Sequence, residues 1–132
     1  MGETAQKAIR AIHHVQITIP CGAEDEARAF YGEVLGLHEI EKPGALRSRG
    51  GIWFSVGNRA LHIGVEDGVN RRLTKAHVAY EVADLAIWRQ LLETHGIQIE
   101  QSIPVPGFER FEFRDPFGNR VELIEPAQSG TP

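Results

Sequence analysis

The sequence predicts an α+β fold built from two similar units, each with one strand, one helix and three further strands. Three observations predict it. Several short segments alternate apolar and polar residues, as strands with one buried face do. Two longer segments carry apolar residues at helical spacing and end at a glycine. The order of the segments also recurs, with 63 positions between His14 and His77 and 60 positions between Gly36 and Gly96.

The first unit begins with a cleanly alternating strand. Its two faces are Val15, Ile17 and Ile19 on one side and His14, Gln16 and Thr18 on the other. Residues 24–35 then place apolar side chains at helical spacing behind an acidic first turn, and Gly36 ends this predicted helix. We expect the remaining strands of the unit at 39–42, 52–56 and 60–65.

The second unit repeats this order after a polar segment. Residues 77–82 alternate as the first strand does, and Asp84 is placed to cap a helix at 85–95. A further strand is expected at 97–103. The unit closes with a predicted hairpin at 110–125, whose turn is Asp115-Pro116-Phe117-Gly118-Asn119.

The chain is therefore expected to form one structural domain of two modules. The first module covers residues 12–66 and the second covers 76–126, with 67–75 as the linker. Residues 1–11 and 127–132 are expected to be flexible ends.

The hairpin delivers a carboxylate to the face opposite its apolar residues. Alternation puts Glu122 on the other side of the strand from Val121 and Leu123. If the turn pairs Arg114 with Arg120, Glu112 lies directly across from Glu122, and like charges so placed are destabilising. A bound cation would relieve that repulsion. The alternative is a solvated hairpin face that tolerates both carboxylates.

Composition limits the class of partner. The 132 residues suffice for one compact domain with a real core. A net charge of −4 leaves no electrostatic footprint for nucleic acid or an anionic membrane. No apolar run approaches the ~20 residues of a membrane span, and the polar N-terminal stretch lacks a signal-peptide core. The single Cys21 excludes an intramolecular disulfide and fits a reducing compartment, so we expect a cytoplasmic protein with a small-molecule partner.

Four polar residues recur at matching positions of the two units. Each first strand contributes His14 or His77, and each last strand contributes His62 or Glu122, which are 60 positions apart. If the two units pair around a pseudo-twofold axis, these side chains converge. Imidazoles with a carboxylate suit Zn, Ni, Mn, Co or Fe(II). A lone strand histidine is more often a surface residue than a ligand, and we interpret His13, His38 and His95 as structural.

At this point the sequence resembles the glyoxalase, bleomycin-resistance and ring-cleaving dioxygenase superfamily, also called the vicinal oxygen chelate proteins. The resemblance covers roughly residues 12–125. It is carried by Ile12-His13-His14-Val15, Phe30-Tyr31, Val34-Leu35-Gly36-Leu37, Leu61-His62, His77-Val78 and the stretch from Asp115 to Glu122. The resemblance implies paired βαβββ modules that form an open, eight-stranded, barrel-like cleft, and it implies a homodimer.

The resemblance also implies roles for single residues. His14, His77 and Glu122 match the usual metal triad of the superfamily. His62 stands where glyoxalase I places an additional carboxylate ligand, which leaves Glu122 to serve as the catalytic base. Glu112 stands where the fosfomycin-modifying and ring-cleaving members carry a tyrosine. A carboxylate there would repel anionic catecholates or phosphonates.

Other residues are candidates for contact with substrate. Gln16 shares the face of His14, and Trp53 alternates away from its apolar neighbours, so both join Glu112 as predicted substrate-binding residues. Strand aromatics are nevertheless more often core. Four arginines could hold an anionic substrate, but we favour a surface position for all of them; they are Arg47, Arg49, Arg110 and Arg114.

Together these features predict a metal-dependent lyase or isomerase of glyoxalase type, acting on a small substrate chelated through adjacent oxygens. The metal would act as a Lewis acid, and Glu122 would act as ligand and base. One alternative is a non-catalytic dimer that sequesters a drug or metabolite, as in the bleomycin-resistance branch. Another is an Fe(II) ring-cleaving dioxygenase, and a third is a vestigial metal site.

Overall fold

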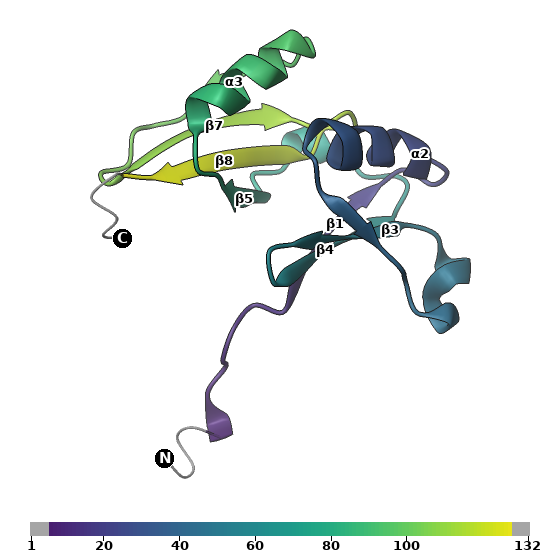
Figure 1. Cartoon of the computed structure of the whole chain (residues 1–132). Helices are drawn as coiled ribbons and strands as arrows, with labels where there is room; N and C mark the ends of the chain where they lie inside the picture. The colour runs from purple at the N-terminus through teal and green to yellow at the C-terminus, as the bar shows by residue number, and fades with distance from the viewer. Residues whose placement is uncertain (1–5, 128–132) are drawn as a thin grey trace.

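Two four-stranded sheets form the framework of the chain (Figure 1). The computed structural model describes residues 6–127. The strand order is β1-β4-β3-β2 in the first sheet and β5-β8-β7-β6 in the second. In each sheet the first strand of the unit pairs in parallel with the last, and all other neighbours are antiparallel. The repeat predicted from the sequence is therefore confirmed as a repeat of topology.

The elements follow one another in the predicted order. The first unit consists of β1 (His14–Ile19), α2 (Glu24–Ala27), the π-helical segment η1 (Arg28–Val34), β2 (His38–Ile40), the 3-10 segment η2 (Gly44–Arg49), β3 (Ile52–Val56) and β4 (Arg59–Val65). A short 3-10 turn, η3 (Arg71–Leu73), leads to the second unit. That unit consists of β5 (His77–Glu81), α3 (Leu85–Thr94), β6 (Glu100–Gln101), β7 (Phe108–Arg114) and β8 (Arg120–Pro126).

The predicted elements differ most in three places. The strand expected at 39–42 is β2, which begins one residue earlier and ends two residues earlier, at Ile40. The helix expected at 24–35 changes to a wider turn at its second half, where the Leu35 amide donates to the Phe30 carbonyl at 2.9 Å. The strand expected at 97–103 is wrong for most of its length, because β6 pairs with β7 at two positions only. The Ile97 amide instead donates to the Leu92 carbonyl at 3.0 Å, so Ile97 closes the end of α3.

The predicted flexible ends fall partly outside the described residues. Residues 1–5 and 128–132 lie beyond them, and residues 6–13 are exposed ahead of β1. Within residues 6–127, no helix is long and apolar enough to cross a membrane.

One hydrophobic core serves both sheets. Figure 1 shows α2 and α3 on the same side of the two sheets. The buried apolar side chains of the strands and of the helices form one cluster. The Phe30 ring of η1 lies 6.2 Å from the Phe113 ring of β7, which joins the two units. A fully buried aromatic side chain contributes roughly 1.5–3 kcal/mol. The opposite face of both sheets, termed the open face, carries polar side chains, some of which are buried.

A buried polar network also ties the hairpin turn to the first unit. Asp115 is only 2% exposed, and its carboxylate accepts hydrogen bonds from the Tyr31 hydroxyl at 2.6 Å and from the Asn119 side-chain amide at 2.9 Å. The same amide donates to the Thr18 carbonyl of β1 at 2.9 Å. Burial, and then the negative charge of Asp115, raises the pKa of Tyr31 well above its usual value.

Replacing Tyr31 with Phe should lower the free energy of unfolding by about 2 kcal/mol at neutral pH, because the buried Asp115 carboxylate loses a donor. The pH dependence should change as well. The folded-state pKa is raised, so above about pH 10 the unfolded chain releases the Tyr31 proton while the folded chain keeps it, and stability falls. Urea unfolding at pH 7 and at alkaline pH measures both effects.

Tyr80, whose pKa burial also raises, remains in the variant, so the alkaline loss of stability should be reduced and not abolished. Identical alkaline losses in the two proteins would contradict this account.

Candidate metal centre

The β7–β8 hairpin sets two carboxylates side by side on the open face of the second sheet. Its register pairs Arg114 with Arg120 and Glu112 with Glu122, as the sequence predicts. Glu112 is 7% exposed and Glu122 is 4% exposed. The alternative of a solvated hairpin face is therefore wrong, because both carboxylates are buried.

Two arginines on the same face compensate these charges. The Arg120 Nε donates to Glu112 Oε1 at 2.8 Å, and a second nitrogen of the same guanidinium contacts the same oxygen. An Arg110 nitrogen donates to Glu122 Oε2 at 3.3 Å. Two guanidinium groups thus relieve the repulsion between the carboxylates, which we expected a bound cation to relieve. Because Arg120 balances Glu112, this carboxylate no longer argues against an anionic substrate.

Arg110 corrects one prediction directly. The sequence pattern favours a surface position for it, but its side chain is only 19% exposed and faces Glu122. Two of its nitrogens donate to the Ile103 carbonyl, at 2.8 and 3.2 Å, which fixes the guanidinium from the other side. The signal that could have found Arg110 and Arg120 is their position: each lies two residues from a glutamate on its own strand, and alternate residues share a face.

His77 joins this group from β5. Its Nε2 lies 2.9 Å from Glu122 Oε1, and its Nδ1 lies 2.9 Å from the Lys75 carbonyl oxygen. A carbonyl only accepts, so Nδ1 carries a hydrogen and the ring turns Nε2 towards the carboxylate. A histidine oriented by a carbonyl in this way is typical of metal ligands.

The donor set fits a divalent transition metal. Ligand atoms of His77, Glu112 and Glu122 all lie within 4.8 Å of one another, and no other group of three potential ligands gathers in this way within residues 6–127. An imidazole nitrogen with carboxylate oxygens suits Zn, Mn, Fe and related ions. Because Glu112 forms an ion pair with Arg120, His77 and Glu122 are the two residues of this group that are more available as metal ligands.

The other predicted ligands lie on the first sheet, outside this group. The His62 ring stacks on His14, with centroids 4.0 Å apart, and on Trp53, with centroids 3.8 Å apart. Gln16 and Trp53 both pair with His62 in the strand register. Burial lowers the pKa of His62, and the charges of His14, His13 and Lys42 lower it further.

These first-sheet residues line one groove. Its volume is about 550 Å³, and His14, Gln16, Trp53 and His62 all contribute to its wall. The structure therefore brings the predicted residues together as two sets, with His77, Glu112 and Glu122 on the second sheet and the remaining four on the first. The sequence places each residue on the correct face but does not show this division.

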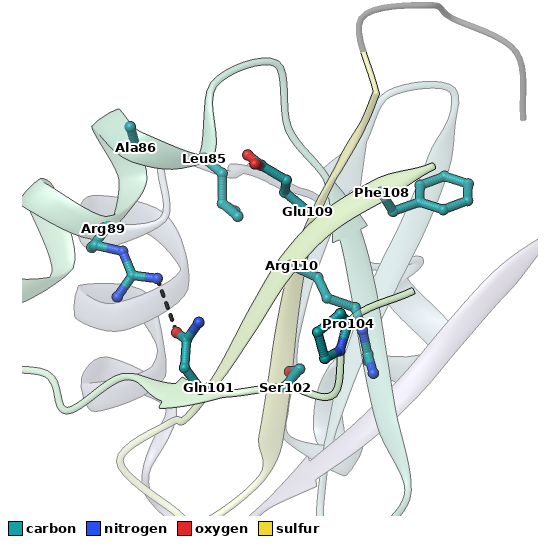
Figure 2. A pocket seen from close by; sticks show the side chains of 9 residues that line it. All are labelled: Leu85, Ala86, Arg89, Gln101, Ser102, Pro104, Phe108, Glu109 and Arg110. Carbon is teal, nitrogen blue, oxygen red and sulfur yellow. Dashed lines mark hydrogen bonds between the residues drawn. The ribbon is translucent and has the colours of Figure 1, made fainter. Parts of the chain in front are cut away.

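A separate cavity of about 320 Å³ lies between α3 and the edge formed by β6 and β7 (Figure 2). Figure 2 shows Arg89 directed at Gln101, to which it donates at 3.1 Å, and Arg110 at the far wall. None of the predicted metal ligands lines this cavity. The chemistry of the candidate site belongs to the open face of the sheets.

Comparison with known proteins identifies the family. The sequence model of the Glyoxalase/Bleomycin resistance protein/Dioxygenase superfamily matches residues 11–123. The chain belongs to this superfamily, which confirms the resemblance seen in the sequence. A search of curated proteins gives no match.

Solved structures agree with this assignment. A protein assigned to the glyoxalase family from Bacillus anthracis is 45% identical, with a TM-score of 0.85 over 91% of this chain and 98% of that one. Lactoylglutathione lyase from Agrobacterium tumefaciens is 25% identical, with a TM-score of 0.69 over 90% and 96% of the two chains. The fosfomycin resistance protein FosX from Listeria monocytogenes, in complex with Mn(II) and sulfate, shares the fold at 16% identity, with a TM-score of 0.73 over 92% and 94%.

Replacing Arg120 with Met should remove the closest ion-pair partner of the buried Glu112, leaving only Arg110 at 3.9 Å, and lower the free energy of unfolding by about 3 kcal/mol. A second change, Glu112→Gln, should recover much of that loss. Urea denaturation of the single and double variants measures both the loss of stability and its recovery. Arg114→Met is the matched control, because the Arg114 guanidinium donates to the Gly118 carbonyl and to no carboxylate among the described residues. Equal losses for the two arginine variants would show that Glu112 does not depend on Arg120.

Proposed function

We propose that this protein is a metal-dependent lyase or isomerase that acts on a small substrate chelated through adjacent oxygens. The observation that carries the proposal is the approach of His77 Nε2 to the buried Glu122 carboxylate, at 2.9 Å, in a superfamily that includes lactoylglutathione lyase. The metal is a divalent transition ion: Zn, Ni, Mn, Co or Fe. The substrate, the reaction and the metal are all parts of this proposal.

A homodimer would complete the site. His77 and Glu122 lie on the open face of the second sheet, whereas His14 and His62 lie on the first sheet outside their reach. A twofold axis that brings the first sheet of one copy against the second sheet of another forms two identical sites. Ile9 and Ile12, just before β1, are 95% and 71% exposed, and a partner would bury them. We therefore propose His14 of a second copy as the third ligand, with His62 as a fourth ligand or a hydrogen-bonding partner of the substrate.

The residues of the chain have distinct parts in this chemistry. A bound metal would polarise the substrate oxygens and stabilise the negative charge that forms on them. Glu122 would take a proton from the carbon beside the chelated oxygens and, in an isomerisation, return it to the neighbouring carbon. Arg110 orients the Glu122 carboxylate through the 3.3 Å hydrogen bond, and the Lys75 carbonyl orients the His77 ring.

A second candidate function is ligand sequestration without chemistry. The observation that favours it is the groove of the first sheet, whose wall includes the stacked Trp53 and His62 rings and which needs no metal to hold a flat molecule. We place either activity in the cytoplasm, because the exposed Cys21 is unpaired, as expected in a reducing compartment.

Metal content separates the two candidate functions. Protein purified without chelator should carry close to one metal per chain, and His77→Ala should lose most of it because an imidazole ligand is gone. Elemental analysis measures this directly. His95→Ala is the control, since His95 is exposed at the end of α3 and outside the cluster. Absence of metal in every protein, even after soaking, would favour sequestration.

Mixing two inactive variants tests the shared site. His14→Ala and His77→Ala should each bind little metal, because each removes one imidazole from both sites of its dimer. After joint refolding, about half of the dimers are mixed, and each mixed dimer has one intact site, so metal should return to about a quarter of the wild-type content. No recovery in proteins shown to be mixed would mean that His14 and His77 do not act across copies.

A further inference from the structure

The groove of the first sheet carries unbalanced positive charge, whereas Arg110 and Arg120 balance the charges of the carboxylate cluster. Lys42 and Arg49 line it together with His14, Trp53 and His62, and no aspartate or glutamate is among its lining residues. Charged side chains that face a concavity set the sign of the ligand that it attracts. We propose that this groove binds the oxyanion of a small organic ligand, a carboxylate or a phosphate-type group, through Lys42 and Arg49.

The acidic residues near this groove already have other partners. Glu24 does not line the groove, and one of its oxygens is held by the Gly51 amide at 2.8 Å, although this bond leaves its charge in place. Glu41 forms an ion pair with Arg47 at 2.9 Å. Lys42 donates to the Gly50 carbonyl, which leaves its positive charge uncompensated. Within residues 6–127, neither Lys42 nor Arg49 lies within ion-pair distance of a carboxylate. Both charges are therefore available to an anion.

The segment that carries these cations is held in place at both ends. At its start, Lys42 is tied to the Gly50 carbonyl on the far side of η2. At its end, Gly51 has a positive φ of 85°, and a Cβ at this position would lie 2.2 Å from the Ile63 carbonyl oxygen. The close contact with β4 requires glycine and anchors the segment against the sheet. The backbone that carries Lys42 and Arg49 is therefore held in place, which lowers the cost of ordering an anion site on it.

The position of the groove also indicates the rest of the ligand. His14 lines the same wall, and His14 is the ligand that we propose for the metal of a partner copy. A molecule held at Lys42 and Arg49 would extend along the Trp53 and His62 rings towards His14. This step rests on the proposed function, and it narrows the substrate class to small molecules with an anionic group at one end and adjacent oxygens at the other.

Trp53 offers a direct reporter of binding. The chain has two tryptophans, so a Trp88→Phe background leaves the Trp53 emission alone. Phenylphosphonate and benzoate serve as phosphate-type and carboxylate probes, with benzyl alcohol as the neutral analogue. At least one anion should change the Trp53 fluorescence saturably, and the stronger of the two identifies the oxyanion. Lys42→Gln and Arg49→Gln should each weaken its binding at least about tenfold, because a charge-assisted contact is lost.

The matched control is Arg47→Gln on the same η2 segment, whose guanidinium is paired with Glu41 and is absent from the groove wall. Its binding should equal that of the background protein. The proposal is overturned if benzyl alcohol binds as well as the anions, if neither anion saturates, or if Arg47→Gln weakens binding as much as Arg49→Gln.

Metal analysis of the same proteins separates this inference from the proposed function. The Lys42→Gln/Arg49→Gln double variant should keep the wild-type metal content, and His77→Ala should keep anion binding. Anion binding in a protein that never takes up metal would overturn the proposed enzyme function and support the proposed anion site in the groove. Stoichiometric metal without any anion binding would overturn the proposed anion site and support the proposed enzyme function.

Discussion

The candidate site depends on the compensation of two buried carboxylates by two arginines across one hairpin. Glu112 and Glu122 lie directly opposite each other and are almost fully buried, an arrangement that is unfavourable without counter-charges. Arg120 and Arg110 supply them, and they also fix the orientation of the carboxylates. Because Arg120 occupies Glu112, Glu122 is left to face His77. The same ion pairs that compensate the buried charges therefore select which carboxylate is available to a metal.

Most of the correct predictions came from the alternation of apolar and polar residues along the strands. A period of two fixes the face of every side chain, so the sequence correctly placed Glu122 opposite Val121 and paired Glu112 with it across the turn. The 60-residue repeat led to the two four-stranded sheets for the same reason. Boundaries were less predictable: residues 97–103 alternate like a strand, but the end of α3 captures the Ile97 amide.

Distances between the sheets could not be predicted in this way. Periodicity assigns His14, His62, His77 and Glu122 to open faces, but it says nothing about how far one sheet lies from the other. In the structure His14 and His62 stack on the first sheet, and His77 meets Glu122 on the second. Ion pairs were missed as well, since arginines are usually surface residues and Arg110 was interpreted as one. Both features follow from tertiary packing, and the division of the site is the reason why we propose a second copy of the chain.

The central claim is that one metal lies between His77 and Glu122 of one copy and His14 of another. Anomalous diffraction at the absorption edge of the bound metal, in crystals of metal-loaded protein, tests it most directly because it locates the ion. The account predicts one anomalous peak per chain at coordination distance from those three side chains, about 2.0–2.2 Å. A peak held by a single copy, or one on other residues, would contradict it.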